Sequence, residues 1–194
     1  MKRTALGLSL FVGLGLVAAI SGCANLIPPQ AVNFDLNGGA GLEFAVTPGE
    51  PVQRMATLSF NPAGVNITGG TFEIKPEAIT LNAEEAQPGK IATRLQGGVV
   101  TVSGRVAIPG QEDDVCNSTD VYGAYDVTFD NNLAVTDINP SSITLSTNTI
   151  TVLNADPDPT TGLISVAICL DVSAPFTGTV TIRALTFNIN ITLQ

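Results

Sequence analysis

The segment VTIRALTFNINITL, residues 180–193, carries the clearest structural pattern in this 194-residue chain. Its apolar side chains alternate with polar ones, a period of two that is typical of a β-strand with one buried face. The apolar positions move from even to odd numbers near Ala184, which predicts a β-bulge or a crossing between two sheets. Beyond that point we expect Phe187 and Ile189 to face the core and Asn188 and Asn190 to face solvent.

The same alternation continues toward the N-terminus from this segment. ISVAICLDV, residues 164–172, has five apolar side chains in one phase, and Gly, Pro and Asn separate further short segments of this kind. This spacing predicts an all-β fold, an antiparallel β-sandwich of the immunoglobulin-like or jelly-roll-like kind, as a single domain over residues 31–194. Residues 143–145 and 150–152 are interpreted as strands on either side of a turn, and 83–86 as the one helical candidate.

The composition excludes several kinds of catalytic chemistry. The chain has no histidine and no tryptophan. Without histidine it cannot form a Ser-His-Asp or Cys-His arrangement, and it offers no imidazole ligand to zinc or copper. Hydrolysis by paired carboxylates needs no histidine, but no spacing singles out such a pair, and the aromatic platforms usual at glycosidase sites are missing. We therefore expect no enzymatic activity and no cofactor.

The first 22 residues have the three parts of a secretory signal peptide. Two basic residues open the segment, an apolar run extends from Leu6 to Ile20, and two small residues precede Cys23. The run is about 15 residues long, which is short for a membrane-spanning helix of about 20 residues. An ordinary signal peptide and an uncleaved anchor are the alternatives.

The ISGC motif at residues 20–23 resembles the lipobox of bacterial lipoproteins, in which an aliphatic and two small residues precede the cysteine that becomes the mature N-terminus. The resemblance covers only the signal and the first mature residues. It implies that Cys23 receives a diacylglyceryl group and a further acyl chain, such as palmitate, which together anchor the protein stably. Ala24, rather than Asp, follows the cysteine, which in bacteria with two membranes implies transfer to the outer membrane. Residues 23–30 then form the lipidated cysteine and a short tether.

Cys116 and Cys169 are the two cysteines that remain after lipidation. An even pair in an exported domain indicates a disulfide. Closing a loop of this length would stabilise the fold by about 4 kcal/mol in the chain-entropy description. The alternative is two buried free thiols.

Two acidic clusters lie near these cysteines in the sequence. Asp113 and Asp114 come just before the first cysteine, and Asp156 and Asp158 precede the strand that holds the second. Calcium prefers six to eight oxygen ligands, so these carboxylates are candidate calcium ligands. The second cluster departs from the EF-hand pattern, and the alternative is that both clusters are solvated loops.

The mature chain is strongly acidic. Lys2 and Arg3 belong to the leader, which leaves 17 acidic and six basic residues and a net charge of −11. Such a domain repels nucleic acid and anionic lipid headgroups, so attachment to the membrane is left to the lipid.

These features favour an exported, lipid-anchored β-sandwich of the cell envelope that acts by surface interaction, as a structural, adhesion or assembly component. An envelope protein or a cell-wall polymer is the expected partner. The alternative is a carrier of a small apolar ligand or lipid, which the apolar content allows. A hydrolase is the third interpretation.

Overall fold

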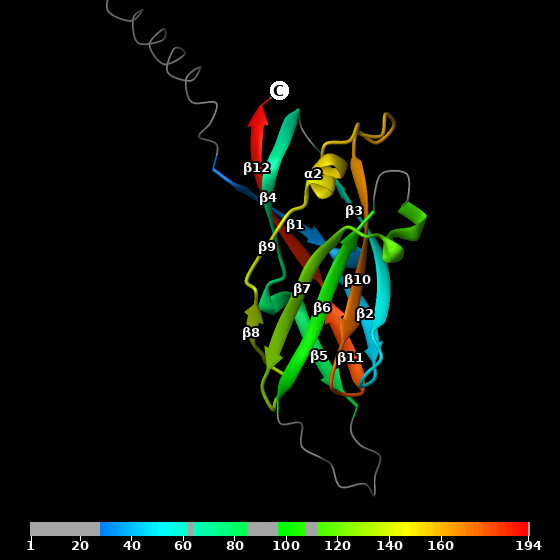
Figure 1. Ribbon diagram of the computed structural model, residues 1–194, viewed down its shortest axis with the longest axis vertical. Helices are drawn as coiled ribbons and strands as arrows, with labels where there is room; N and C mark the ends of the chain where they lie inside the picture. Colours follow the sequence, from blue (N-terminus) through cyan, green and yellow to red (C-terminus); the bar gives the residue numbers. More distant parts are fainter. Residues whose placement is uncertain (1–27, 62–63, 85–96, 108–111, 194) are drawn as a thin grey trace, which may run out of the picture.

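A computed structural model of the chain describes residues 28–61, 64–84, 97–107 and 112–193. Within these residues the chain forms twelve β-strands, one α-helix and three short 3-10 helices (Figure 1). Every strand pair is antiparallel. The predicted all-β antiparallel sandwich is therefore confirmed.

The strands are two to ten residues long. In chain order they are β1 (Gln30–Asp35), β2 (Leu42–Val46), β3 (Val52–Phe60), β4 (Val65–Glu73), β5 (Ile79–Ala83), β6 (Gly98–Val106), β7 (Val121–Phe129), β8 (Val135–Asn139), β9 (Ile143–Thr144), β10 (Ile164–Ser173), β11 (Gly178–Ile182) and β12 (Ala184–Leu193). The helices are η1 (Leu36–Gly39), η2 (Pro76–Ala78), η3 (Glu112–Asn117) and α2 (Thr147–Leu153).

One layer of the sandwich is a five-stranded sheet of order β3-β10-β6-β7-β8. Strand β10 pairs with β3 on one side and with β6 on the other. Its five in-phase apolar side chains are all buried, which places them on the inner face of this sheet. The alternate residues of the same strand, among them Cys169 and Asp171, therefore lie on the outer face.

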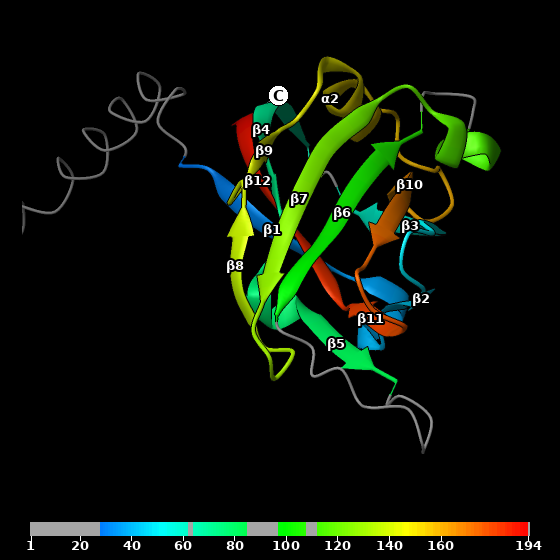
Figure 2. The same cartoon turned by 60° about the horizontal axis from the view of Figure 1, so that its bottom comes forward.

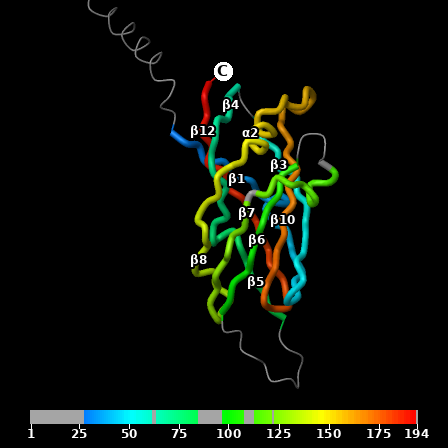
Figure 3. The backbone as a smooth tube through the Cα atoms, in the orientation of Figure 1, coloured from blue at the N-terminus to red at the C-terminus, as the bar shows by residue number. Residues whose placement is uncertain are grey.

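The facing layer consists of a four-stranded sheet, β1-β12-β4-β9, and a three-stranded sheet, β2-β11-β5. The strands follow the same spatial order in both sheets, because β1 continues into β2, β11 continues into β12 and β4 continues into β5 (Figures 2 and 3). Backbone hydrogen bonds continue across the junction: Leu36 N–H donates to Arg183 O at 2.7 Å, and Arg183 N–H donates to Ala78 O at 2.8 Å. Hydrogen bonding thus continues from one sheet to the other, and the layer bends at the level of η1, η2 and Arg183. We call this bend the seam.

The seam explains the change of phase seen in the C-terminal sequence. Arg183 is the single residue between β11 and β12, and the chain crosses there from one sheet to the other. Gly41 lies at the same bend with φ of +90°, and a Cβ atom on it would come within 2.8 Å of Thr181 Cγ2. Only glycine fits this close approach without displacement. The predicted crossing near Ala184 is therefore confirmed.

The core fills the space between the two layers. Phe187 is 1% exposed, and its ring lies 5.2 Å from those of both Phe34 and Phe72. Ile189 is also buried, whereas Asn188 is half-buried and Asn190 is exposed. The predicted orientation of β12 is confirmed.

The segment after β9 differs from the prediction. Residues 150–152 do not form a strand but belong to α2, which begins after Ser146, whose side chain accepts a hydrogen bond from the Thr149 N–H. Thr149, Val152 and Leu153 are buried, the i, i+3, i+4 spacing of one helix face. The alternation of Ile150 and Val152 was misleading because a helix of seven residues is too short for its period to show. The helical candidate at 83–86 is also wrong in part: Ala83 ends β5, and residues 85–86 lie outside the described residues.

Candidate functional site

The expected lipidation site, Cys23, and the predicted signal peptide over residues 1–22 lie outside the described residues. The described chain begins at Pro28, and Gln30 pairs with Ile189 in the second half of β12. The first described strand, β1, therefore begins toward the end of the sheet where β12 finishes (Figure 1). No helix within the described residues is long and apolar enough to cross a bilayer.

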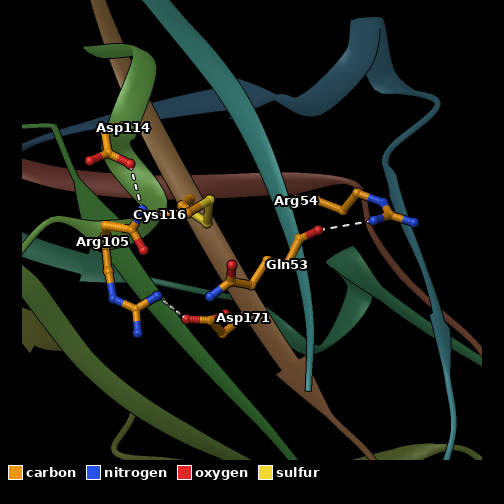
Figure 4. Close-up of a disulfide and its surroundings, with 8 residues drawn as sticks. Gln53, Arg54, Arg105, Asp114, Cys116 and Asp171 are labelled. Atoms are coloured by element: carbon orange, nitrogen blue, oxygen red, sulfur yellow. Dashed lines mark hydrogen bonds and ion pairs between the residues drawn. A yellow bond between two sulfur atoms is a disulfide. The ribbon is translucent and has the colours of Figure 1, made fainter. Parts of the chain in front are cut away.

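The predicted disulfide between Cys116 and Cys169 is present. The Sγ atoms are 2.09 Å apart and the Cα atoms 5.1 Å apart. Cys169 is fully buried and packs in a small cluster with Ala107 and Val115. Because Cys169 faces outward from β10, the bridge fastens η3 onto the outer face of the five-stranded sheet (Figure 4).

An ion pair lies beside the disulfide on that outer face. Arg105 of β6 is the register partner of Cys169, and its guanidinium binds the carboxylate of Asp171 (Figure 4). Both side chains are partly buried. At the edge of the sheet, Arg54 of β3 donates to the backbone carbonyl of Glu43 in β2 at 3.2 Å. These two arginines are therefore engaged within the fold.

The candidate calcium ligands are not brought together. Asp113, Asp114, Asp156 and Asp158 are all exposed, and among the described residues no three or more carboxylate, cysteine or histidine side chains form a cluster that could hold a metal. Asp158 instead accepts the N–H groups of the residues two and three positions later, at 2.8 Å each. These hydrogen bonds lower the pKa of Asp158. Its carboxylate orders its own loop.

Two titratable side chains are buried in the described part of the chain, Asp120 and Tyr125. The Asp120 carboxylate accepts the hydroxyl of Ser146 at 2.8 Å and lies 3.4 Å from that of Thr149, which fixes the start of α2 against the β7 end of the sheet. Tyr125 donates across the core to the carbonyl of Phe72 at 2.5 Å. Burial, and then the negative charge of Glu73, raise the pKa of Tyr125. Both groups tie elements of the fold together.

A groove of about 280 Å³ lies on the seam of the bent layer. We call it the seam groove. It is lined by Asn33, Asp35, Lys75, Glu77, Ala78, Arg183, Ala184 and Thr186. The bend creates it, because η2 and Arg183 interrupt the regular surface of the strands at the same level. On one side, Thr186 Oγ1 donates to Asn33 Oδ1 at 2.7 Å, which fixes the wall made by β1 and β12.

The seam groove is lined by charged side chains that form no ion pair within the described residues. Four cationic side chains lie in the described part of the chain, and Arg54 and Arg105 are engaged as described above. Among those described residues, the side chains of Lys75 and Arg183 have no ion-pair or hydrogen-bond partner. Both are exposed, and both line the groove with the two carboxylates of Asp35 and Glu77. Such an open, mixed-charge surface suits a partner that carries both carboxylate and amine groups.

An apolar pocket occupies the other side of the bent layer. It is lined by Val32, Phe34, Phe60, Ile67, Leu153, Phe187 and Ile189. Its volume of about 10 Å³ is at the lower limit for one water molecule. A lipid chain or a small apolar ligand does not fit into it as it stands.

Comparisons with models of protein families, with curated proteins and with solved structures found no match. What the domain can bind is therefore inferred from its own geometry. Within that geometry, the disulfide was predictable from the cysteine count, but the seam groove was not. Its two cations are 108 positions apart in the sequence, and the one signal for it was the phase change at Arg183.

Proposed function

We propose that this protein is a lipid-anchored component of a bacterial cell envelope that acts by binding a partner on its outer surface, with the seam groove as the contact surface. The lipobox-like motif at residues 20–23 supports the anchor and the export. The observation that carries the surface interaction is the placement of Lys75 and Arg183 in one groove. The chain has 17 acidic and eight basic residues, and these two cations have no ion-pair or hydrogen-bond partner among the residues that the structure describes.

The groove indicates the chemistry of the partner. Two cations favour carboxylate groups on the partner, and the carboxylates of Asp35 and Glu77 favour its amines. Peptide segments carry both, either in an envelope protein or in the peptide part of a cell-wall polymer. Because the groove is open along the seam, a long chain lies across it without having to be enclosed.

The buried titratable groups and the small internal pocket also favour a role at the surface of the domain. The two buried titratable groups of the described residues, Asp120 and Tyr125, are already bound to other elements, so neither is available to act on a substrate. The apolar pocket of about 10 Å³ offers little to the carrier alternative. Retention of a lipid by the purified domain in native mass spectrometry would favour the carrier.

Carbodiimide cross-linking in intact cells tests the proposal, because this reagent joins a lysine amine directly to a carboxylate that touches it. We expect the tagged, full-length protein to form a discrete adduct that the double variant Lys75→Gln, Arg183→Gln loses. A matched control, Gln53→Glu with Thr57→Glu, changes the net charge equally on the exposed outer face of β3 and should keep the adduct. An adduct that survives in the groove variant, or no adduct with the unaltered protein, would contradict the proposal.

A further inference from the structure

The apolar face of β12 continues past the end of the core. Leu193 is 73% exposed, the most exposed of the large apolar side chains in the described residues. It has the same phase as Phe187 and Ile189, so it extends their core-facing row. Its partner across the ladder is Val65 of β4, which is only half-buried. An apolar ledge therefore projects where β4 begins and β12 ends.

This end of the bent layer carries no charge. We define the uncharged tip as residues 28–33, 64–71 and 188–193, which contain no Asp, Glu, Lys or Arg although the chain has 17 acidic residues. Its outer side is a shallow groove of about 440 Å³. That groove is lined by Pro29, Gly69, Gly70, Thr71, Thr144, Asn188 and Asn190. Uncharged carboxamides, hydroxyls and exposed glycine backbone thus surround the apolar ledge.

The tip is also the part of the domain closest along the chain to Cys23. Pro28 follows Cys23 by five positions, so the two Cα atoms are at most about 18 Å apart, whatever the path between them. Pro29 lies against the strands of the tip. A lipid on Cys23 therefore keeps this end of the domain within a short distance of the membrane surface.

We infer that the uncharged tip rests on the bilayer that holds the anchor, with Leu193 in the region between headgroups and acyl chains. This inference depends on the lipid anchoring proposed above. An acidic domain is repelled by anionic headgroups, and the tip is a surface without that repulsion. The loop after α2 carries exposed Asp156 and Asp158, so the contact is confined to the β4–β12 side. The seam groove, nearer the middle of the molecule, then lies farther from the membrane than the tip.

Single-tryptophan probes test this orientation, because the chain has no tryptophan of its own. The full-length lipidated protein carrying Leu193→Trp is reconstituted in vesicles of phosphatidylethanolamine and phosphatidylglycerol, with and without phospholipid brominated near the top of its acyl chains. The control is Val99→Trp: Val99 is 45% exposed and is the second residue of β6, which begins at the opposite end of the molecule (Figure 1). Interfacial side chains lie ~5–10 Å into the boundary region, so bromine should reduce emission of the Leu193 probe about twofold or more and leave the Val99 probe unchanged.

Cosedimentation with the vesicles separates this inference from the anchor. If the protein cosediments but neither probe is quenched, or both are quenched equally, the tip does not face the bilayer and the inference is overturned. If emission of the Leu193 probe shifts to the blue with protein concentration and without quenching, a second copy of the chain covers the tip, which also overturns it. If the protein does not cosediment, the anchor itself is refuted and the inference fails with it.

Discussion

Replacing Phe187 with alanine removes the ring on which the interior of the bent layer depends. The side chain is 1% exposed and packs against Phe34 and Phe72 at 5.2 Å each. A buried Phe→Ala change costs about 3–5 kcal/mol, and two aromatic neighbours place this one toward the upper end. For a domain of this size each kcal/mol lowers Tm by about 2–4 °C, so we expect a drop of about 8–20 °C.

Urea unfolding followed by circular dichroism measures this loss on the mature protein with its disulfide intact. Leu193→Ala is the matched control, because Leu193 lies on the same strand and in the same phase but is 73% exposed. Its free energy of unfolding should change by no more than about 0.5 kcal/mol. A loss below about 1 kcal/mol for Phe187→Ala, or equal losses for both variants, would show that the assignment of β12 to the core is wrong.

Three further perturbations test other parts of the structure. Changing Cys116 and Cys169 together to alanine should lower the free energy of unfolding by about 4 kcal/mol, because the bridge closes a loop of 53 residues; urea unfolding that matches the unaltered protein would contradict this. Asn154→Ala should cost about 1–3 kcal/mol in the same assay, since its carboxamide pairs with both the N–H and the carbonyl of Ile67, and a neutral result would show that water replaces it. Because the pKa of Tyr125 is raised in the folded protein, the stability that this residue contributes is complete below pH ~10 and is lost as the pH rises further. Tyr125→Phe should therefore flatten the fall in the free energy of unfolding between pH 9 and 11. Parallel falls in the variant and the unaltered protein would refute this.

Much of the fold was predictable from the sequence where one face of a strand meets the core throughout its length. The five in-phase side chains of β10 and the row from Phe187 to Ile189 are examples, because burial on one face of a strand imposes a period of two. The crossing at Arg183 was predictable for the same reason, since a change of sheet changes which face is buried. The disulfide followed from the even number of cysteines that remain in a chain whose first residues predict export.

Other features depend on contacts that no local pattern encodes. The helix α2 is held by the Ser146 cap and by the pairing of Asn154 with Ile67, 87 positions away in the sequence. The seam groove requires three strands to bend at the same level, which brings Asp35, Lys75 and Arg183 together. Their proximity follows from register, and the sequence alone does not fix the register of distant strands.

We propose that Cys23 carries the lipid that holds this domain at a membrane. Metabolic labelling with a palmitate analogue, applied to the unaltered protein and to Cys23→Ser, tests it most directly. We predict that the unaltered protein is labelled and fractionates with membranes, and that Cys23→Ser is unlabelled and leaves the membrane fraction. Equal labelling of the two proteins would show that Cys23 is not the lipid acceptor.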